Sequence, residues 1–152
     1  MENHKNVIET LNHALSLEWA GNIQYLQHSF LVHGLWRELY KPFFRSRASE
    51  CQDHAKLLGE KIAAFGGLPT VEPAPIKQSR EIEEMLQQDL ELEKAAVVAY
   101  KDVLNVAKDD VALRHMMETL IETETRSVEE LEKMLSLKLA KMKEKEIRLK
   151  VS

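Results

Sequence analysis

The sequence has few of the residues that break helices or crosslink chains. Its 152 residues include five glycines, four prolines and a single cysteine, Cys51. One cysteine cannot form an internal disulfide, and no cysteines have zinc-finger spacing, so a reducing, cytoplasmic setting is expected. A chain of this length can bury a core without disulfides or a structural metal. Any metal that it binds is therefore free to serve a function.

Long apolar runs and a positive net charge are also missing. No segment approaches the roughly 20 apolar residues of a membrane span, and the opening "MENHKNVIETL" is polar and amphipathic rather than a leader. We therefore expect a soluble cytoplasmic protein without a membrane partner. The net charge of −4 gives no general attraction to nucleic acid, so nucleic acid is not expected as a partner either.

The charge is unevenly distributed along the chain. Residues 138–152 contain six lysines or arginines and two glutamates, a net charge of +4, which leaves about −8 on the rest. We therefore divide the chain into a helical domain, residues 1–136, and a basic C-terminal helical extension or tail, residues 137–152. This tail is either a solvated helix end or a contact for an acidic partner or neighbouring subunit.

Apolar residues recur every three to four positions in four long segments, which predicts four helices. The first runs from about His4 to His33, and the second starts near Glu38 or just after Pro42 and ends at the glycines 66 and 67. Residues 66–79 hold three of the four prolines and have no helical period, so they are predicted to be an extended connection.

The third helix is expected to begin after Ser79 as its N-cap and to end at "KDD", residues 108–110. The fourth runs from Val111 to at least Leu135. Fourteen extended residues span roughly 45 Å, more than a 25-residue helix at about 37 Å. The second connection can therefore cross the whole length of the molecule. This predicts an all-α, antiparallel four-helix bundle of two hairpins joined by a long crossover, as in ferritin-like bundles.

Each apolar stripe carries one metal-capable side chain near its middle: Glu18, His54, Glu93 and Glu124. In an antiparallel hairpin, residues equally far from the turn lie at the same height. Glu18 and His54 are each 18 residues from position 36, and Glu93 and Glu124 are equidistant from position 108.5. All four side chains are therefore predicted to share one layer of the bundle.

Three carboxylates crowded in a core would cost several kcal/mol each unless they were protonated or neutralised by a cation. A divalent metal ion resolves that conflict. Oxygen ligands with one imidazole suit iron or manganese, and zinc can occupy the same kind of site. The alternative is that the acids lie at the edges of the stripes or pair with lysine or arginine.

Two segments carry a family resemblance. "LNHALSLEWAGNIQYLQH" and "MLQQDLELEKAAV" resemble the first and third helices of bacterioferritins and related ferritin-like di-iron proteins. The resemblance covers about residues 5–135. It implies that Glu18 and Glu93 are iron ligands, with Tyr25 and Asp89 as supporting residues beside them.

The resemblance also marks departures from the family pattern, which has a Glu-x-x-His pair on the second and fourth helices. Here Cys51 precedes His54 at that spacing, and Glu50 is the nearest acid. On the fourth helix Glu124 is in the bridging position, but Ser127 stands where the second histidine belongs. We therefore expect one metal position, formed by Glu18, His54 and Glu124, to bind an ion well. The other position, which keeps Glu93, is expected to bind an ion weakly.

Glu50 would strengthen the weak position if it turned inward, because residues four apart share a helix face. Cys51 is either a further ligand, which would favour zinc or ferrous iron, or a small buried thiol that fills space. Gln52 stands where haem-binding members of the family have methionine, so haem is not expected.

The resemblance implies iron binding, and oxidation of ferrous iron if the site turns over, together with assembly into dimers or hollow cages. The alternatives are a non-catalytic scaffold or binding protein that has lost the di-iron function, and a single structural zinc or manganese site. The remaining histidines lack partners at metal spacing, and we expect them to be partly exposed or near the surface: His13, His28, His33 and His115.

Overall fold

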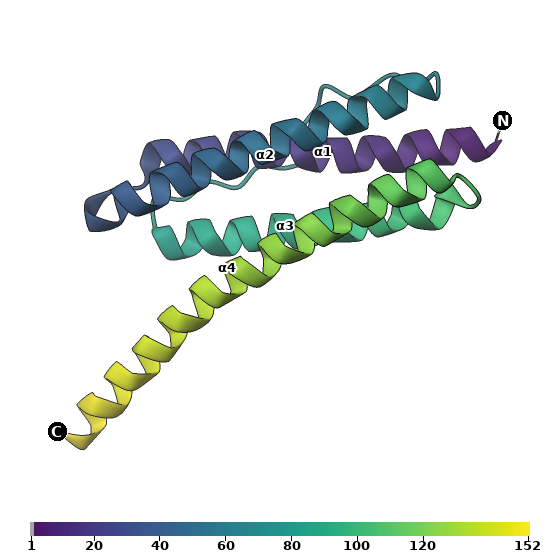
Figure 1. Ribbon diagram of the computed structural model, residues 1–152. Helices are drawn as coiled ribbons and strands as arrows, with labels where there is room; N and C mark the ends of the chain where they lie inside the picture. The colour runs from purple at the N-terminus through teal and green to yellow at the C-terminus, as the bar shows by residue number, and fades with distance from the viewer. Residues whose placement is uncertain (1) are drawn as a thin grey trace.

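The computed structural model describes the backbone of residues 2–152 and the side chains of residues 4–136 and 143–152. Four helices make up most of the chain (Figure 1): α1 (Glu2–Leu31), α2 (Arg37–Ala64), α3 (Ile82–Ala107) and α4 (Val111–Val151). A short 3-10 turn, η1 (Gly34–Trp36), joins α1 to α2. The part of the chain that the structure describes contains no strand.

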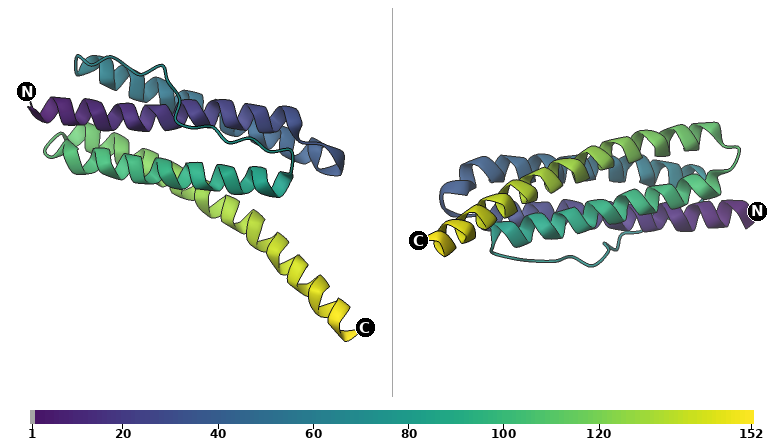
Figure 2. Two further views of the ribbon diagram at one scale, coloured as in Figure 1. Left: turned by 180° about the vertical axis from the view of Figure 1, so that it is seen from behind. Right: turned by 90° about the horizontal axis from the view of Figure 1, so that it is seen from below.

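The helices form two antiparallel hairpins, α1 with α2 and α3 with α4, packed side by side through α1 and α3. The segment from residue 65 to residue 81 is not helical and runs along the outside of the bundle from one end to the other, as the left-hand view of Figure 2 shows. The predicted fold, an all-α antiparallel four-helix bundle with a long crossover between its second and third helices, is confirmed.

The crossover is tied to α1 by hydrogen bonds at several points. Asn12 accepts from the backbone amide of Thr70 at 2.8 Å, and the Trp19 indole donates to the Thr70 carbonyl at 3.0 Å. Further along, Gln24 accepts from the backbone amide of Lys77 at 3.0 Å. These bonds satisfy backbone groups that an extended segment would otherwise leave to water.

Two predicted helix starts need correction. Residue Glu81 occupies the N-cap position of α3, so Ser79 is not the cap; its hydroxyl instead accepts from the Glu81 amide at 3.0 Å within the preceding turn. Helix α2 begins at Arg37, and Pro42 lies inside it, so a start after Pro42 is wrong. Pro42 is the sixth residue of α2, so its missing N–H costs the helix one backbone hydrogen bond without ending it.

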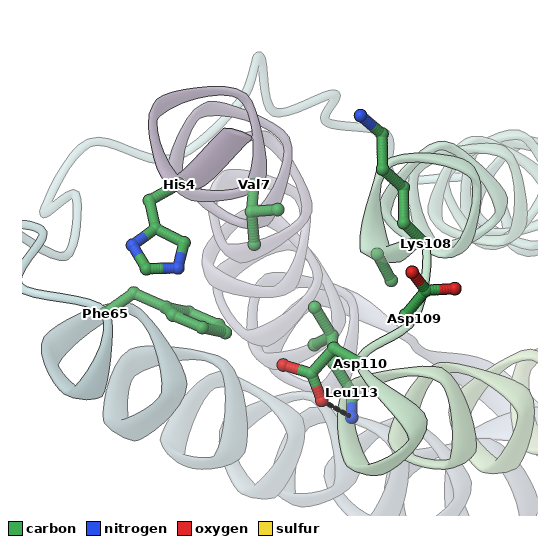
Figure 3. A pocket seen from close by; sticks show the side chains of 8 residues that line it. His4, Val7, Phe65, Lys108, Asp109, Asp110 and Leu113 are labelled. Carbon is green, nitrogen blue, oxygen red and sulfur yellow. Dashed lines mark hydrogen bonds between the residues drawn. The ribbon is translucent and has the colours of Figure 1, made fainter. Parts of the chain in front are cut away.

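The predicted break at residues 108–110 is present. Lys108 takes a positive φ of 49° at the turn, and the Asp110 side chain caps α4 by accepting from the Leu113 amide at 2.9 Å. This turn meets the start of α1 around a pocket of about 180 Å³. Figure 3 shows His4 and Val7 on one side of the pocket and the acidic turn on the other.

The core consists of two apolar clusters. The first includes Leu15 on α1, Leu58 on α2 and Leu120 on α4, and the second includes Tyr25, Phe44 and Leu131 on the same helices. On every helix the predicted metal-capable residue falls between the members of the two clusters. A polar layer therefore crosses the bundle between two apolar ones.

No helix in the described part of the chain is long and apolar enough to cross a membrane. Helix α4 continues past the bundle to Val151 (Figure 1). The side chains of residues 137–142 lie outside the described residues. The division of the chain at residues 136 and 137 stays a prediction.

Candidate metal centre

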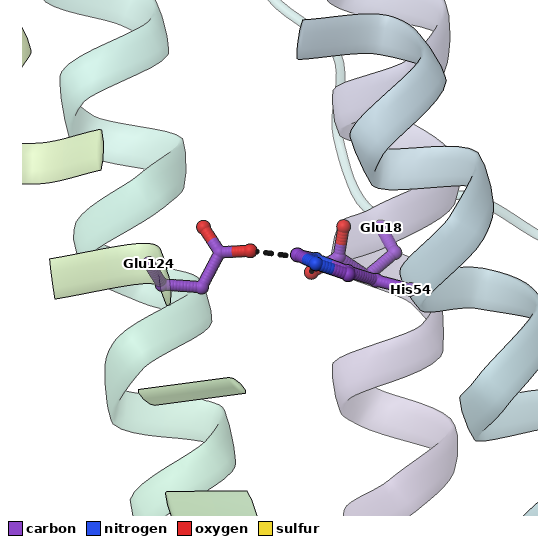
Figure 4. A group of neighbouring side chains, drawn as sticks. All are labelled: Glu18, His54 and Glu124. Atoms are coloured by element: carbon purple, nitrogen blue, oxygen red, sulfur yellow. Dashed lines mark ion pairs between the residues drawn. The ribbon is translucent and has the colours of Figure 1, made fainter. Parts of the chain in front are cut away.

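Three of the predicted ligands meet in the polar layer. Glu18 comes from α1, His54 from α2 and Glu124 from α4, and one ligand atom of each lies within 4.8 Å of the others. All three residues are buried. Figure 4 shows the imidazole of His54 lying between the two carboxylates. The spacing argument from the sequence therefore places these side chains correctly.

The His54 imidazole is held by charge rather than by hydrogen bonds. Its Nδ1 atom lies 2.8 Å from Glu124 Oε1 and 3.5 Å from Glu18 Oε1, yet none of the described residues is aligned to form a hydrogen bond with it. Burial alone would lower the pKa of His54, but Glu124 and Glu18 outweigh burial and raise it from 6.5 to about 10. Without a metal, His54 is therefore an imidazolium ion.

Glu18 is held from a second side by α3. Tyr100 is fully buried and donates a hydrogen bond from its hydroxyl to Glu18 Oε1. Burial raises the pKa of Glu18, and the nearby His54 opposes this effect without cancelling it. Tyr100 thus fixes the same carboxylate oxygen that lies 3.5 Å from His54 Nδ1.

Glu93 on α3 lies beside this group rather than within it. Tyr25 donates a hydrogen bond to Glu93 Oε1 at 2.7 Å. Burial and then the neighbouring Glu124 raise the pKa of Glu93 well above its ordinary value of 4.5. Two adjacent carboxylates in a dry core resist carrying two charges. Without a cation, burial and the charge of Glu124 both favour the protonated form of Glu93.

The structure does not bring Glu50 into the group. Its carboxylate accepts from Arg47 at 3.3 Å near the surface of α2. Ser127, buried on α4, also accepts a hydrogen bond from Arg47 and donates to the Thr123 carbonyl at 3.3 Å. Sequence reasoning missed Arg47, although its position two turns before His54 puts it on the same face of α2.

Cys51 is buried against α1. A Cβ atom added at Gly21 would lie 2.7 Å from the Cys51 sulfur, so the thiol fills the space that this glycine leaves open. Burial raises the pKa of Cys51 well above 9.0, and the charges of Glu18, Glu93 and Glu124 add to the effect. The sulfur is thus a neutral thiol, which agrees with the space-filling alternative for this residue.

Asp89 forms a polar network behind Glu93. His28 Nδ1 lies 3.0 Å from Asp89 Oδ2, Gln24 donates to Asp89 Oδ1 at 2.9 Å, and His28 Nε2 lies 3.2 Å from Gln88 Oε1. The expectation that His28 is partly exposed is wrong, because it is fully buried between α1 and α3. Its partners lie about 60 residues away, so no local signal in the sequence marks them.

The other histidines that were expected near the surface, His13, His33 and His115, are exposed as expected.

The donor set fits one divalent metal ion. Two carboxylates and an imidazole are hard and borderline ligands, which suit iron, manganese or zinc. The His54 nitrogen is buried without a hydrogen-bond partner among the described residues, and such an atom gains a partner when a metal binds. Beside these ligands, the Cys51 sulfur fills the space at Gly21, and Ser127 accepts a hydrogen bond from Arg47.

Comparison with known proteins gives one consistent result. The family model of the ferritin-like domain matches residues 8–140. Bacterioferritin from Streptomyces coelicolor is 29% identical over 141 residues, which cover 90% of this chain and 84% of that protein. A bacterial ferritin from Pseudomonas aeruginosa is 32% identical over 141 residues, covering 90% of this chain and 91% of the relative.

A solved structure agrees with the sequence comparisons. The crystal structure of ferritin-like, diiron-carboxylate proteins from Bacillus anthracis str. Ames matches with a TM-score of 0.86 and 34% identity, covering 89% of this chain and 99% of that chain. The chain belongs to the ferritin-like domain family.

Proposed function

We propose that this chain is an iron-binding member of its family that holds the ion with Glu18, His54 and Glu124. The observation that carries the proposal is the meeting of these three side chains, from three different helices, within 4.8 Å of one another. Manganese and zinc are the alternative ions, because the same donor set suits them.

The residues of the layer prepare the site by holding protons that a metal ion replaces. The pKa values of His54 and Glu93 are both raised in the metal-free protein, which favours their protonated forms. A metal ion needs a neutral imidazole and ionised carboxylates. Tyr25 and Tyr100 orient Glu93 and Glu18 through hydrogen bonds from their hydroxyls. Binding is therefore an exchange of protons for a metal ion in a layer that is already organised.

If the protein turns over, ferrous iron is its substrate and the reaction is oxidation to ferric iron by oxygen or peroxide. Each ferrous ion gives up one electron, so the reduction of O₂ to peroxide consumes two ions and two protons. Glu93 would complete the weaker second position in that reaction. Family membership and the ligand group support this activity, and the departures at Cys51 and Ser127 weigh against efficient turnover.

The test compares the wild-type chain with Glu18→Gln, which keeps the shape of the side chain and removes a ligand charge. Glu122→Gln is the matched control, because Glu122 is exposed on α4 and pairs with Arg126. After purification without chelator, the wild type and the Glu122→Gln control should contain iron. When ferrous iron is added, ferric absorbance should develop faster with these two proteins than with Glu18→Gln. No metal and no rate difference would instead favour a non-catalytic scaffold.

A third outcome would favour the remaining alternative, a single structural zinc or manganese site. If zinc or manganese raises the melting temperature of the wild type while no iron is oxidised, the ion has a structural role. Metal-dependent stabilisation should then disappear in Glu18→Gln and remain in Glu122→Gln.

We also propose a homo-oligomer, a dimer or a larger cage, in the cytoplasm and without haem. Exposed apolar side chains at one end of the α1 and α2 hairpin support association: Phe30, Trp36 and Leu39 are each more than half exposed. Such a patch is typical of a protein contact surface. Native mass spectrometry tests the oligomeric state, and an absorbance spectrum of the purified protein tests the absence of haem.

A further inference from the structure

Arg47 is a fixed positive charge at the edge of the carboxylate layer. Its side chain is 12% exposed. The guanidinium donates to Ser127 Oγ and, at 2.7 Å, to Glu130 Oε2, both on α4. Its other contact is Glu50 on its own helix, at 3.3 Å. Arg47 thus bridges α2 and α4, and its charge cannot move freely into solvent.

The charge of Arg47 reaches the buried acids of the layer. It lowers the pKa of Glu93 and of Asp89, although burial is the larger effect on both and raises them. Burial would lower the pKa of Arg47 itself, but the ionisable groups around it, with Tyr25, Glu50 and Glu93 foremost, raise it overall. Arg47 therefore stays charged next to the acids.

Arg47 faces the residues that a second metal position would need. Ser127 and Glu50 are hydrogen-bonded to the guanidinium, and Glu93 feels its charge. A metal ion bound among these side chains would have to displace both hydrogen bonds. It would also lie close to a like charge in a layer from which water is largely excluded, where repulsion is strong.

We propose that the Arg47 guanidinium takes the place of a second metal ion, so that the centre binds one divalent cation per chain instead of a pair. The inference rests on the proposed metal-binding function and adds to it the number of ions. It also accounts for the departures from the family pattern: where Ser127 replaces a histidine, the guanidinium fills the space.

The first experiment titrates the metal-free, full-length protein with Mn²⁺ alone. Calorimetry should give one ion per chain, and the electron paramagnetic resonance spectrum should show isolated Mn²⁺ without exchange coupling. Two ions per chain with a coupled spectrum would overturn the inference and leave the proposed metal binding intact. No binding would overturn both.

The second experiment uses Arg47→Met, which keeps an unbranched side chain over the Phe43 ring that Arg47 now covers at 5.3 Å. Removing the like charge should tighten binding of the first Mn²⁺ by about tenfold. Arg126→Met is the matched control, because Arg126 is exposed on α4, and it should leave the affinity unchanged. An unchanged affinity in Arg47→Met would count against the inference.

The third experiment restores a ligand. Ser127→His alone should still bind one Mn²⁺, because the guanidinium remains against the new imidazole. The double variant Arg47→Met with Ser127→His should bind two ions with a coupled spectrum. A double variant that folds, as judged by circular dichroism, and still binds one ion would contradict the inference. If it does not fold, the wild-type count and the affinity of Arg47→Met decide the matter.

Discussion

His54 Nδ1 lies 2.8 Å from Glu124 Oε1 in a layer where both residues are buried. Glu124 and Glu18 together raise the pKa of the imidazole to about 10, which favours its protonated form in the metal-free protein. A metal ion that binds both residues has to displace that proton. The pair therefore predicts how metal binding depends on pH.

Metal affinity should rise with pH. Binding of Mn²⁺ is expected to release the proton of His54, whose pKa is about 10, so the affinity should increase at least tenfold between pH 6 and pH 7. Glu93, whose pKa is also raised, adds to this release. Calorimetry in buffers that differ in ionisation enthalpy counts the protons. An affinity that does not change between pH 6 and pH 8 would show that these groups do not exchange protons for metal.

The metal-free protein should lose stability as the pH rises from 7 to 9. The folded pKa of His54, about 10, is above the ordinary value of 6.5, so the native state binds more protons than the unfolded state in this window. The free energy of unfolding then falls by about 1.4 kcal/mol per pH unit. Urea denaturation with a chelator present measures the slope.

His54→Gln is the control for this slope, since glutamine keeps a polar group without a proton that titrates. Its free energy of unfolding should depend less steeply on pH than that of the wild type. Parallel slopes in the two proteins would mean that His54 does not carry the proton.

The sequence was sufficient to predict the bundle, the crossover and the meeting of Glu18, His54 and Glu124. In an antiparallel hairpin, two residues equally far from the turn lie at the same level along the bundle, and the apolar periodicity shows which side of each helix faces the core. The level and the orientation of these three residues therefore follow from local sequence patterns. Arg47 and His28 were missed for a common reason. Each depends on partners contributed by a distant helix, Ser127 for the first and Asp89 for the second, and a helical period does not reveal such pairs.

Replacement of Tyr25 by phenylalanine should destabilise the metal-free protein. The Tyr25 hydroxyl donates to buried Glu93 at 2.7 Å, and a buried carboxyl group that loses its partner costs about 1–3 kcal/mol. Urea denaturation should show this loss for Tyr25→Phe. Tyr40→Phe serves as the matched control, because Tyr40 is only partly buried and packs by its ring against Phe43 and Phe44. An equal effect of the two changes would contradict the role of the hydroxyl.

Gly21 and Cys51 should show strong coupling, because the Cys51 sulfur occupies the space in which a side chain at position 21 would lie. Alanine at position 21 would place its Cβ 2.7 Å from the Cys51 sulfur, and such overpacking costs about 1–3 kcal/mol. With Cys51→Ala the sulfur is gone, and the nearest remaining atom, the Cβ of residue 51, is 3.6 Å away, an ordinary contact.

The sign of the Gly21→Ala effect should therefore depend on residue 51. In the wild-type background the change should destabilise the protein. In the Cys51→Ala background it should stabilise it by up to about 1 kcal/mol, since alanine favours helix over glycine. A double-mutant cycle by urea denaturation measures the coupling. Equal effects in both backgrounds would mean that the sulfur does not fill the space beside Gly21, and the reading of Cys51 as a packing residue would fail with it.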